Sequence, residues 1–282
     1  MRSAFSTNYH SHSHFCDGVG TPEEQVQGAL QAGLRAFGFS SHCPMPFDNR
    51  WSMKAGRLDD YLRETASLKE KYAGSIELYT GLEVDYIPNR VGPSTYRDRL
   101  DYTVGSVHYV GLDDGRRPWE IDGSQTVFMD GLTEVHQGDI ETVIRLYYGL
   151  IREMVAHDPP DIVGHLDKIK IQNAGHALFD PSADWYRSEV IATLDAVASA
   201  GCMVEVNTRG LYKKALTTYP GPEWLPTMRE RNIPVVLNSD SHHPSEISAG
   251  FRQAGAFLRE AGYNTVRVLL DGHWQDSPID LP

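Results

Sequence analysis

The chain has 282 residues, 40% hydrophobic and 23% charged, with a formal net charge of -12 at pH 7. This composition is that of a folded globular protein with a sizeable core and excludes wholesale disorder. The acidic balance argues against a nucleic-acid partner, because proteins that bind nucleic acids present basic surfaces to the phosphate backbone.

The cysteines Cys16, Cys43 and Cys202 are odd in number and form no CxxC pair. They therefore indicate neither a disulfide framework nor a structural zinc knuckle, and they favour a reducing cytoplasm. The first residues lack the apolar stretch of a signal peptide, and no run approaches the roughly 18 apolar residues of a membrane span. We expect a cytoplasmic protein that has no membrane partner.

Short β-rich runs alternate with longer amphipathic patterns, and no linker or low-complexity segment interrupts them. The expected strands are residues 4–10, 36–42, 76–85, 101–110, 161–167, 202–208 and 233–240. The expected helices are residues 21–33, 58–72, 139–156, 184–200, 223–231 and 245–261. Thr21 is a suitable N-cap for the first helix, because Glu24 follows three residues later. A last apolar run, 263–270, is expected to close or flank the sheet.

This alternation predicts an α/β fold, with residues 1–282 forming a single domain. The expected architecture is a parallel barrel of the TIM type, one unit short of eight.

The first strand ends in a run of histidines, His-Ser-His-Ser-His at 10–14. Side chains alternate along an extended segment, so His10 and His12 face the same way and can bind one cation. Asp17 adds a carboxylate from the turn that follows. On its own, the motif fits a metal site and a surface histidine tract about equally well. We do not count His14 as a ligand; it is either a substrate contact or a solvated residue.

Similar residues recur where the other expected strands end. The full set at the strand ends is His10, His12, His42, Glu83, His108, His165, Asp240 and His242. In a parallel barrel these ends open onto one face, where active sites lie. Each histidine singly fits a hydrogen-bonded core residue, but unpaired buried polar groups at so many strand ends would each cost about 1–3 kcal/mol. Metal coordination removes that cost, and imidazole and carboxylate ligands suit zinc, manganese or iron better than calcium.

The motifs around these residues resemble those of the polymerase and histidinol phosphatase (PHP) family of phosphoesterases, in its histidinol-phosphatase branch. The resemblance covers nearly the whole chain. It rests on HSH at 10–12 with Asp17, SSH ending at His42, GLEVDY with Glu83, GSVHYV with His108, GHLDKIK with His165, and NSDSHH with Asp240 and His242. It implies a distorted, TIM-like (β/α)7 barrel that binds three divalent transition-metal ions (zinc, manganese or iron).

Transferred residue by residue, the resemblance implies three sets of ligands that share Glu83 as a bridge. The sets are His10, His12, Glu83 and Asp240; Asp17, His42 and His242; and Glu83, His108 and His165. Three divalent cations outweigh the three carboxylates of these sets, so an acidic protein would acquire a cationic pocket for a phosphate dianion.

The resemblance further implies a histidinol-phosphatase-like phosphoric monoester hydrolase. The expected reaction converts L-histidinol phosphate into L-histidinol and phosphate, a step of histidine biosynthesis. A hydroxide that bridges two metal ions is expected to attack phosphorus in line. Asp17, Asp240 and His242 are the candidate catalytic residues, and the proton donor to the leaving group stays unassigned between Asp17 and His242.

Contacts to the substrate beyond the metal ions are less constrained. Arg209 follows the sixth strand and is a candidate phosphate contact, as is Lys168, with Lys170 beside it. Further candidates in two long segments are Trp51, Trp119, Glu120 and Asp122. Each of these residues fits an ordinary loop position equally well. Arg209 also stands where histidinol phosphatases often have a small residue, which leaves the identity of the substrate open.

Three alternative functions remain open from the sequence. The protein could act on another small phosphate ester, such as a nucleotide. A metal-dependent amidohydrolase also begins with H-x-H, but it expects a bridging lysine and a lone late aspartate, which Glu83 and the Asp240–His242 pair disfavour. A noncatalytic metal-binding or regulatory protein on the same scaffold would be favoured by lost ligands, and none is lost. The expected partner is a small phosphorylated substrate; the sequence predicts no oligomeric state.

Overall fold

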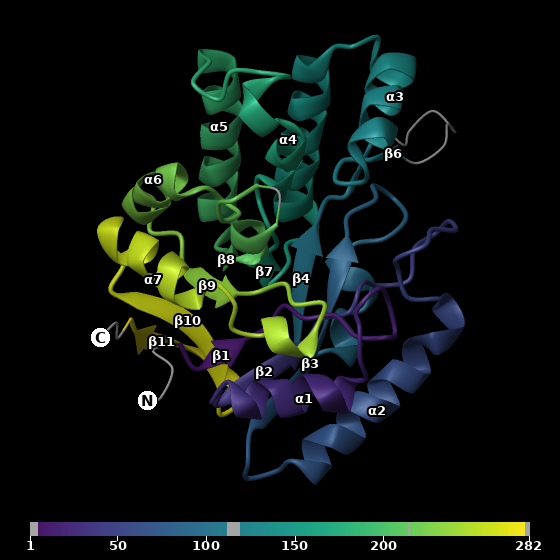
Figure 1. Cartoon of the computed structure of the whole chain (residues 1–282), viewed down its shortest axis with the longest axis vertical. Coiled ribbons are helices and arrows are strands. Elements are labelled where there is room, and N and C mark those ends of the chain that lie inside the picture. The colour runs from purple at the N-terminus through teal and green to yellow at the C-terminus, as the bar shows by residue number, and fades with distance from the viewer. Residues whose placement is uncertain (1–4, 112–118, 214, 280–282) are drawn as a thin grey trace.

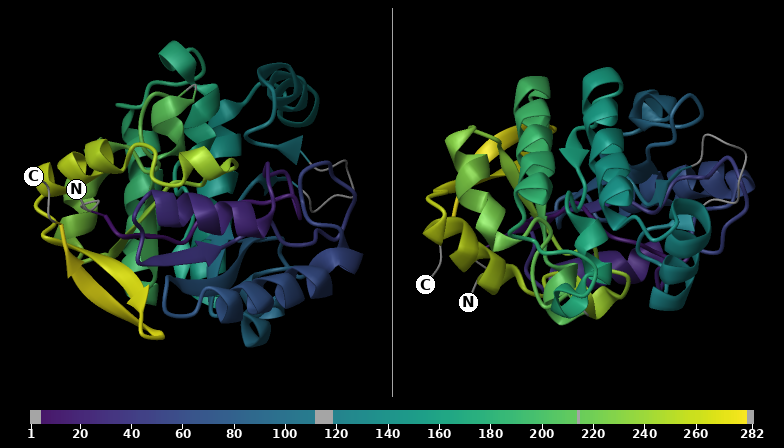
Figure 2. Two further views of the ribbon diagram at one scale, coloured as in Figure 1. Left: turned by 60° about the horizontal axis from the view of Figure 1, so that its bottom comes forward. Right: turned by 90° about the horizontal axis from the view of Figure 1, so that it is seen from above.

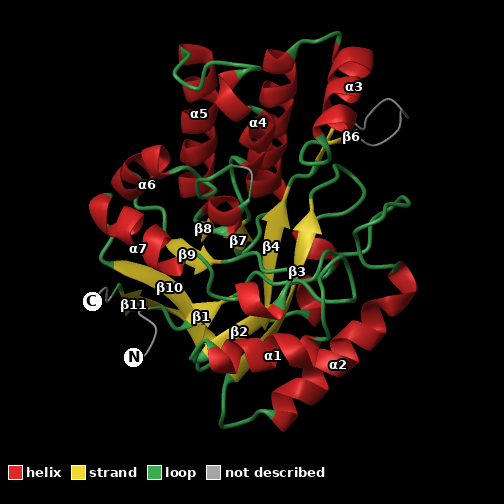
Figure 3. Cartoon of the chain, viewed as in Figure 1, coloured by secondary structure: helices red, strands yellow, loops and turns green. Residues whose placement is uncertain are grey.

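A sheet of seven parallel strands forms the centre of the computed structural model, which describes residues 5–111, 119–213 and 215–279 (Figures 1 and 3). The strands are β1 (Thr7–Asn8), β2 (Ala36–Phe39), β3 (Glu77–Asp85), β4 (Tyr102–Ser106), β7 (Ile162–Val163), β8 (Met203–Asn207) and β9 (Val235–Asn238). Their order in the sheet, β1-β2-β3-β4-β7-β8-β9, follows the chain, and every neighbouring pair is parallel. This confirms the predicted succession of βα units.

The two edge strands, β1 and β9, approach each other and nearly close the sheet into a barrel. An isolated parallel bridge joins Ser11 to Ser241, just beyond these strands. The His12 amide donates to the Ser241 carbonyl at 2.8 Å, and the Tyr9 amide donates to the Asn238 side-chain oxygen at 2.9 Å. Side-chain hydrogen bonds thus join β1 and β9 at the seam of the barrel, where the backbone ladder is short. The nearly closed sheet confirms the predicted distorted TIM-like barrel.

Seven helices of the described residues cover the sheet. They are α1 (Pro22–Gln31), α2 (Leu58–Lys71), α3 (Gln125–His136), α4 (Ile140–His157), α5 (Asp184–Ala200), α6 (Leu225–Glu230) and α7 (Phe251–Glu260). Helices α4 and α5 pack side by side, and α1 and α2 lie on the opposite side of the barrel (Figure 1). The capping box predicted for α1 is present, because the Thr21 hydroxyl accepts from the Glu24 amide and the Glu24 carboxylate accepts from the Thr21 amide.

The chain departs from the sequence prediction after β4. The expected strand 101–110 is interrupted at His108, whose amide donates to the Asp85 carboxylate at 3.0 Å instead of joining the sheet. The next two residues form β5 (Tyr109–Val110), which pairs antiparallel with β6 (Trp119–Glu120) outside the barrel. The turn at His108 directs its side chain toward the centre of the barrel mouth.

One further difference and one confirmed expectation concern the C-terminal third of the chain. The expected helix 245–261 is divided into a 3₁₀ turn (Pro244–Glu246) and α7, with Gly250 between them at a φ of 77°. The apolar run 263–270 contains β10 (Thr265–Leu270), which pairs antiparallel with β11 (His273–Pro278) and flanks the barrel rather than closing it (Figure 2). The Tyr9 hydroxyl ties this hairpin to β1 by donating to the Leu269 carbonyl at 2.7 Å.

None of the helices in the described part of the chain combines the length and apolarity needed to cross a membrane.

Tyr102 on β4 is a buried ring that holds neighbouring strands together. Its hydroxyl donates to the carbonyls of Tyr9 at 2.7 Å and Phe39 at 2.9 Å. The ring lies so close to β3 that a Cβ at Gly81 would stand 2.5 Å from the Tyr102 Cζ atom. Glycine at this position therefore makes room for the ring inside the barrel.

We expect Gly81→Ala to lower the free energy of unfolding by about 1–3 kcal/mol, because the added methyl group overpacks a rigid buried site. Urea unfolding at a constant metal concentration measures the change. Gly149→Ala is the matched control: Gly149 lies within α4 with only the Arg152 guanidinium near its missing Cβ, at 3.9 Å. The control should gain about 0.5–1 kcal/mol. Equal stability of the two variants would contradict the account of Tyr102 packing.

Candidate metal centre

The strand-end residues identified in the sequence converge at one end of the barrel. His10, His12 and Asp17 follow β1, His42 follows β2, and Glu83 lies within β3. His108, His165, Asp240 and His242 follow β4, β7 and β9. Parallel strands bring these segments to the same mouth, although they are far apart in the sequence.

Glu83 lies at the middle of this group, with its side chain 1% exposed. Its Oε2 atom lies 3.1 Å from His10 Nε2, 3.4 Å from His12 Nε2 and 3.0 Å from His42 Nδ1. Its Oε1 atom lies 2.8 Å from His165 Nε2 and 3.7 Å from His108 Nε2. One carboxylate therefore faces five imidazoles, as a bridging ligand between metal ions would.

The atoms that face Glu83 Oε2 test whether this group fits metal ions. The ring nitrogens of His10, His12 and His42 that approach it are buried and make no hydrogen bond with the described part of the chain, and neither does Oε2 itself. Buried polar atoms are costly when they are unpaired, and their convergence within a few ångströms matches the donor set of a divalent transition metal. The residues present thus fit a metal centre.

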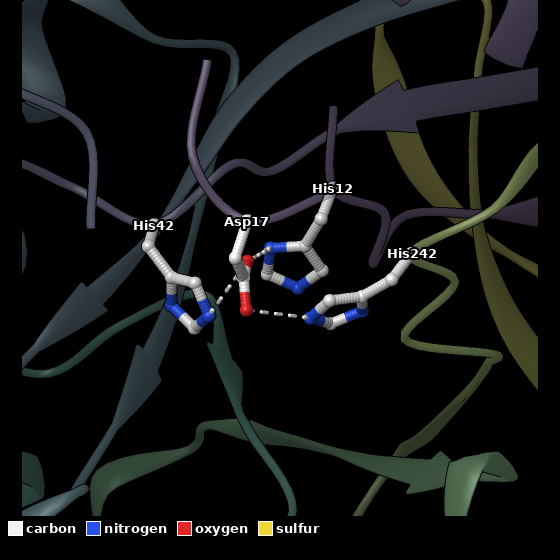
Figure 4. A group of neighbouring side chains, drawn as sticks. All are labelled: His12, Asp17, His42 and His242. Carbon is white, nitrogen blue, oxygen red and sulfur yellow. Dashed lines mark ion pairs between the residues drawn. The ribbon is translucent and has the colours of Figure 1, made fainter. Parts of the chain in front are cut away.

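Asp17 is the focus of a second group, which lies nearer to solvent (Figure 4). Its carboxylate lies 4.0 Å from His12 Nδ1, 3.8 Å from His42 Nε2 and 3.4 Å from His242 Nε2. Figure 4 shows the three imidazoles arranged around this carboxylate.

Asp240 completes the cluster from the β9 side. Its Oδ1 atom lies 3.1 Å from His12 Nε2, 3.7 Å from His10 Nε2 and 3.5 Å from His242 Nδ1. Its φ of 50° is in the left-handed region, which is uncommon for residues other than glycine. The backbone is thus turned sharply where its carboxylate enters the cluster.

Three groups of atoms that could hold an ion emerge from this geometry. They are His12, Asp17, His42 and His242; His10, His12 and Glu83; and His42, Glu83 and His108. The set of Asp17, His42 and His242, which the family resemblance implies, is contained in the first of these groups. His12 and His42 each belong to two groups, so the sets overlap more than the sequence indicated. Among the described residues, His14 belongs to none of the groups.

The electrostatics of the cluster couple its central carboxylate to the imidazoles around it. Burial opposes the ionisation of Glu83, but the charges of His42 and His10 outweigh it and lower the pKa of the carboxyl well below its usual value. Burial also opposes the protonation of His10, but Glu205 and Glu83 outweigh it and raise the pKa of His10 well above its usual value, whereas burial lowers the pKa of His12 well below its usual value. Anionic carboxylates and neutral imidazoles are the forms that bind metal ions, so metal binding would displace a proton from His10.

A cavity of about 420 Å³ opens above the cluster. Of the candidate substrate contacts, Trp51, Glu120, Asp122, Lys168 and Arg209 line it. The other two face elsewhere. Trp119 is buried against Phe128, and Lys170 donates to the Asp167 carboxylate at 2.7 Å.

Two buried carboxylates behind the cluster escaped the sequence analysis. Glu205 on β8 contacts His10 Nδ1 at 2.8 Å, and Asp85 at the end of β3 contacts His108 Nδ1 at 2.9 Å. The signal that could have identified Glu205 is a charged residue inside the apolar run Met203–Val206. A charge in a buried strand needs a partner, and the partner here is a metal-facing histidine.

A nearly closed parallel barrel with a histidine and carboxylate cluster at its mouth defines the class: this is a metal-binding α/β barrel protein. The PHP domain family matches residues 8–209. The chain belongs to the PHP family, in its histidinol-phosphatase branch.

Relatives and a solved structure support this assignment. A Deinococcus radiodurans protein named "Probable histidinol-phosphatase" is 34% identical over 91% of this chain and 94% of its own length. The histidinol-phosphatase of Bacillus subtilis is 28% identical over 88% of this chain and 97% of its own. The fold is similar to that of a histidinol phosphate phosphatase from Lactococcus lactis, solved with zinc, L-histidinol and phosphate. The TM-score is 0.72 at 21% sequence identity, and the match covers 96% of this chain and 98% of the Lactococcus lactis chain.

We expect Glu83→Ala to bind fewer metal ions than the wild type, because it removes both oxygens that five imidazoles face. Metal analysis after exhaustive dialysis measures the number of ions per chain. Glu120→Ala is the control, since Glu120 lines the same cavity but contacts Trp51 and Tyr109. An unchanged ion count in Glu83→Ala would refute the bridging role.

Proposed function

We propose that this protein is a metal-dependent phosphomonoesterase that hydrolyses L-histidinol phosphate to L-histidinol and phosphate. The observation that carries the proposal is the buried carboxylate of Glu83 among five imidazoles, at the floor of a cavity that Arg209 and Lys168 also line. The names of the relatives, which match over nearly their whole length, support this choice of substrate. The reaction would belong to histidine biosynthesis in the cytoplasm.

The proposed centre holds three divalent ions, which are zinc, manganese or iron. Their ligands would be His10, His12, Glu83 and Asp240; Asp17, His42 and His242; and Glu83, His108 and His165. Zinc in the similar Lactococcus lactis protein supports the choice of metal. Bound ions of this kind act as Lewis acids on a phosphoryl group and activate water for attack.

Arg209 is the proposed contact for the phosphate. It lies in the 3₁₀ turn Arg209–Tyr212 after β8, and one of its N–H groups donates to the Asp240 carbonyl at 2.9 Å. This bond orients the guanidinium, whose remaining donors suit two phosphate oxygens. Lys168 adds a second positive charge, held with its Nζ atom 3.8 Å from Asp240 Oδ2 and 3.6 Å from Asp122 Oδ2.

Other residues that line the same cavity suit the leaving group. The Trp51 indole N–H donates to Glu120 Oε1 at 3.2 Å, and the Trp51 ring lies 4.4 Å from the His42 ring. Glu120 and Asp122 therefore offer carboxylates to the ammonium group of histidinol, beside an aromatic surface. These features favour histidinol phosphate over an uncharged alkyl phosphate.

Proton transfer to the leaving oxygen would involve the outer part of the cluster. The side chains of Asp17 and His242 are 34% and 17% exposed, and they lie 3.4 Å apart. Both reach the cavity, so either can meet the leaving oxygen. Asp240, which is buried deeper, would orient His12 and His242 beside it.

We expect the metal-loaded protein to release phosphate from L-histidinol phosphate much faster than from nucleoside monophosphates, and to leave simple amides intact. The physical reason is that the lining of the cavity offers both cations to a phosphate and carboxylates to an ammonium group. Phosphate release and amine release, assayed with zinc or manganese present, distinguish the three substrate classes. Cleavage of amides without phosphate release would overturn the proposal, and preference for a nucleotide would redirect it to another phosphate ester.

We expect Arg209→Ala to raise KM for histidinol phosphate about 10-fold to 100-fold, because a hydrogen bond to a charged group contributes about 1.5–3 kcal/mol. Steady-state kinetics with metal analysis on the same samples separate phosphate binding from ion loss. Lys213→Ala is the matched control: it removes a cation that lines the same cavity and pairs with Glu246, as Arg209 does. Equal effects of the two substitutions would argue for a general charge effect.

A further inference from the structure

Glu205 is a fully buried carboxylate that the proposed reaction does not use. Its Oε1 atom accepts from the His165 amide at 2.7 Å and from Asn207 Nδ2 at 2.8 Å. Its Oε2 atom lies 2.8 Å from His10 Nδ1 and accepts from Asn238 Nδ2 at 3.0 Å. Backbone and amide groups supply three donors to these oxygens, which favours the anionic form of the carboxylate, and an anionic carboxylate acts only as an acceptor.

This arrangement determines the state of the His10 ring. Because Glu205 Oε2 can only accept, His10 Nδ1 carries the ring proton and donates it. His10 Nε2 is then left with a free lone pair, and it is this atom that lies 3.1 Å from Glu83 Oε2 and 3.7 Å from Asp240 Oδ1. A carboxylate behind a histidine is the usual device for orienting a metal-binding imidazole.

The same carboxylate reaches two other members of the cluster. The His165 amide bond to Oε1 holds the backbone where β7 delivers His165 to the other side of Glu83. Asn207 Nδ2 is shared between Glu205 Oε1 and Asp240 Oδ2, at 2.8 and 3.2 Å. Glu205 therefore connects the segments that follow β1, β7 and β9 from a position on β8.

We propose that Glu205 is a positioning residue for the metal centre, which sets the tautomer of His10 and holds His165 and Asp240 in register with it. The proposal rests on the metal centre of the proposed function but not on its substrate. Asp85 has a narrower role. It contacts the amide and Nδ1 of His108 alone among the cluster, at 3.0 and 2.9 Å.

The test is the zinc affinity of Glu205→Gln, measured by dialysing the zinc-loaded protein against a series of zinc buffers. The substitution keeps the size of the side chain, but its NH2 group faces donors that need an acceptor. We expect zinc affinity to fall about 10-fold to 100-fold, the usual effect of losing such a partner. Asp85→Asn should weaken only the ion nearest His108.

Glu189→Gln is the matched control. Glu189 is a largely buried carboxylate that pairs with Arg145 and Arg152, away from the cluster. The control should keep the zinc affinity of the wild type even if its melting temperature falls. Wild-type zinc affinity in Glu205→Gln would overturn the proposal, and so would an equal loss in the Glu189→Gln control.

A measurement on the wild type covers the case in which Glu205→Gln does not fold. In the zinc-loaded protein, nitrogen-15 histidine spectra should show a protonated Nδ1 for His10, and an Nδ1 without a proton would overturn the proposal. The role of Glu205 and the proposed substrate can also be rejected independently, because zinc affinity tests the first and phosphate release tests the second. Weakened zinc binding in Glu205→Gln, with no hydrolysis of histidinol phosphate by the wild type, would sustain the role of Glu205 and reject the substrate.

Discussion

The structure is organised around one buried negative charge. Glu83 lies at the end of the longest strand of the barrel sheet with its carboxylate almost completely removed from water. A buried carboxylate is unfavourable unless opposite charge and hydrogen bonds compensate it. Apart from the Ser106 hydroxyl, which donates to Oε1 at 2.7 Å, the groups that face it are imidazoles. Divalent cations held by the carboxylate and the rings would meet this constraint, so the same residues would serve both the fold and the metal centre.

The barrel supplies the geometry for this arrangement. No single segment holds enough candidate ligands. Six of the seven strands contribute them, from one at β2 to three after β1. The β1–β9 seam is the weak point, because an isolated bridge and side-chain hydrogen bonds join these strands within the described residues. Asn8 and Asn238 make those side-chain bonds, and Asn238 also donates to Glu205. Closure of the barrel and orientation of His10 therefore depend on the same buried polar network.

Charge is distributed unevenly through the molecule. The chain carries a net charge of -12, yet its cavity brings Arg209, Lys168 and the cation-binding cluster together. Five carboxylates and three cations line this cavity, so bound metal ions rather than the side chains alone would make it attractive to a phosphate ester. Lys168 Nζ lies 3.6 Å from Asp122 Oδ2, so both signs of charge meet on the same lining. A substrate with an anionic and a cationic group would find a partner for each in such a cavity.

The sequence by itself determined the order of the strands and the residue types at their ends. Both can be predicted locally, because the periodicity of apolar residues and the types of possible metal ligands are visible in short stretches of the sequence. It did not reveal the break at His108 or the division of the helix before α7, which depend on a contact with Asp85 and on the backbone at Gly250. Only the tertiary structure decided that His12 and His42 each face two groups and that Glu205 stands behind His10. These contacts join residues far apart in the chain, and their distances are set by strand register and barrel closure, which no local pattern encodes.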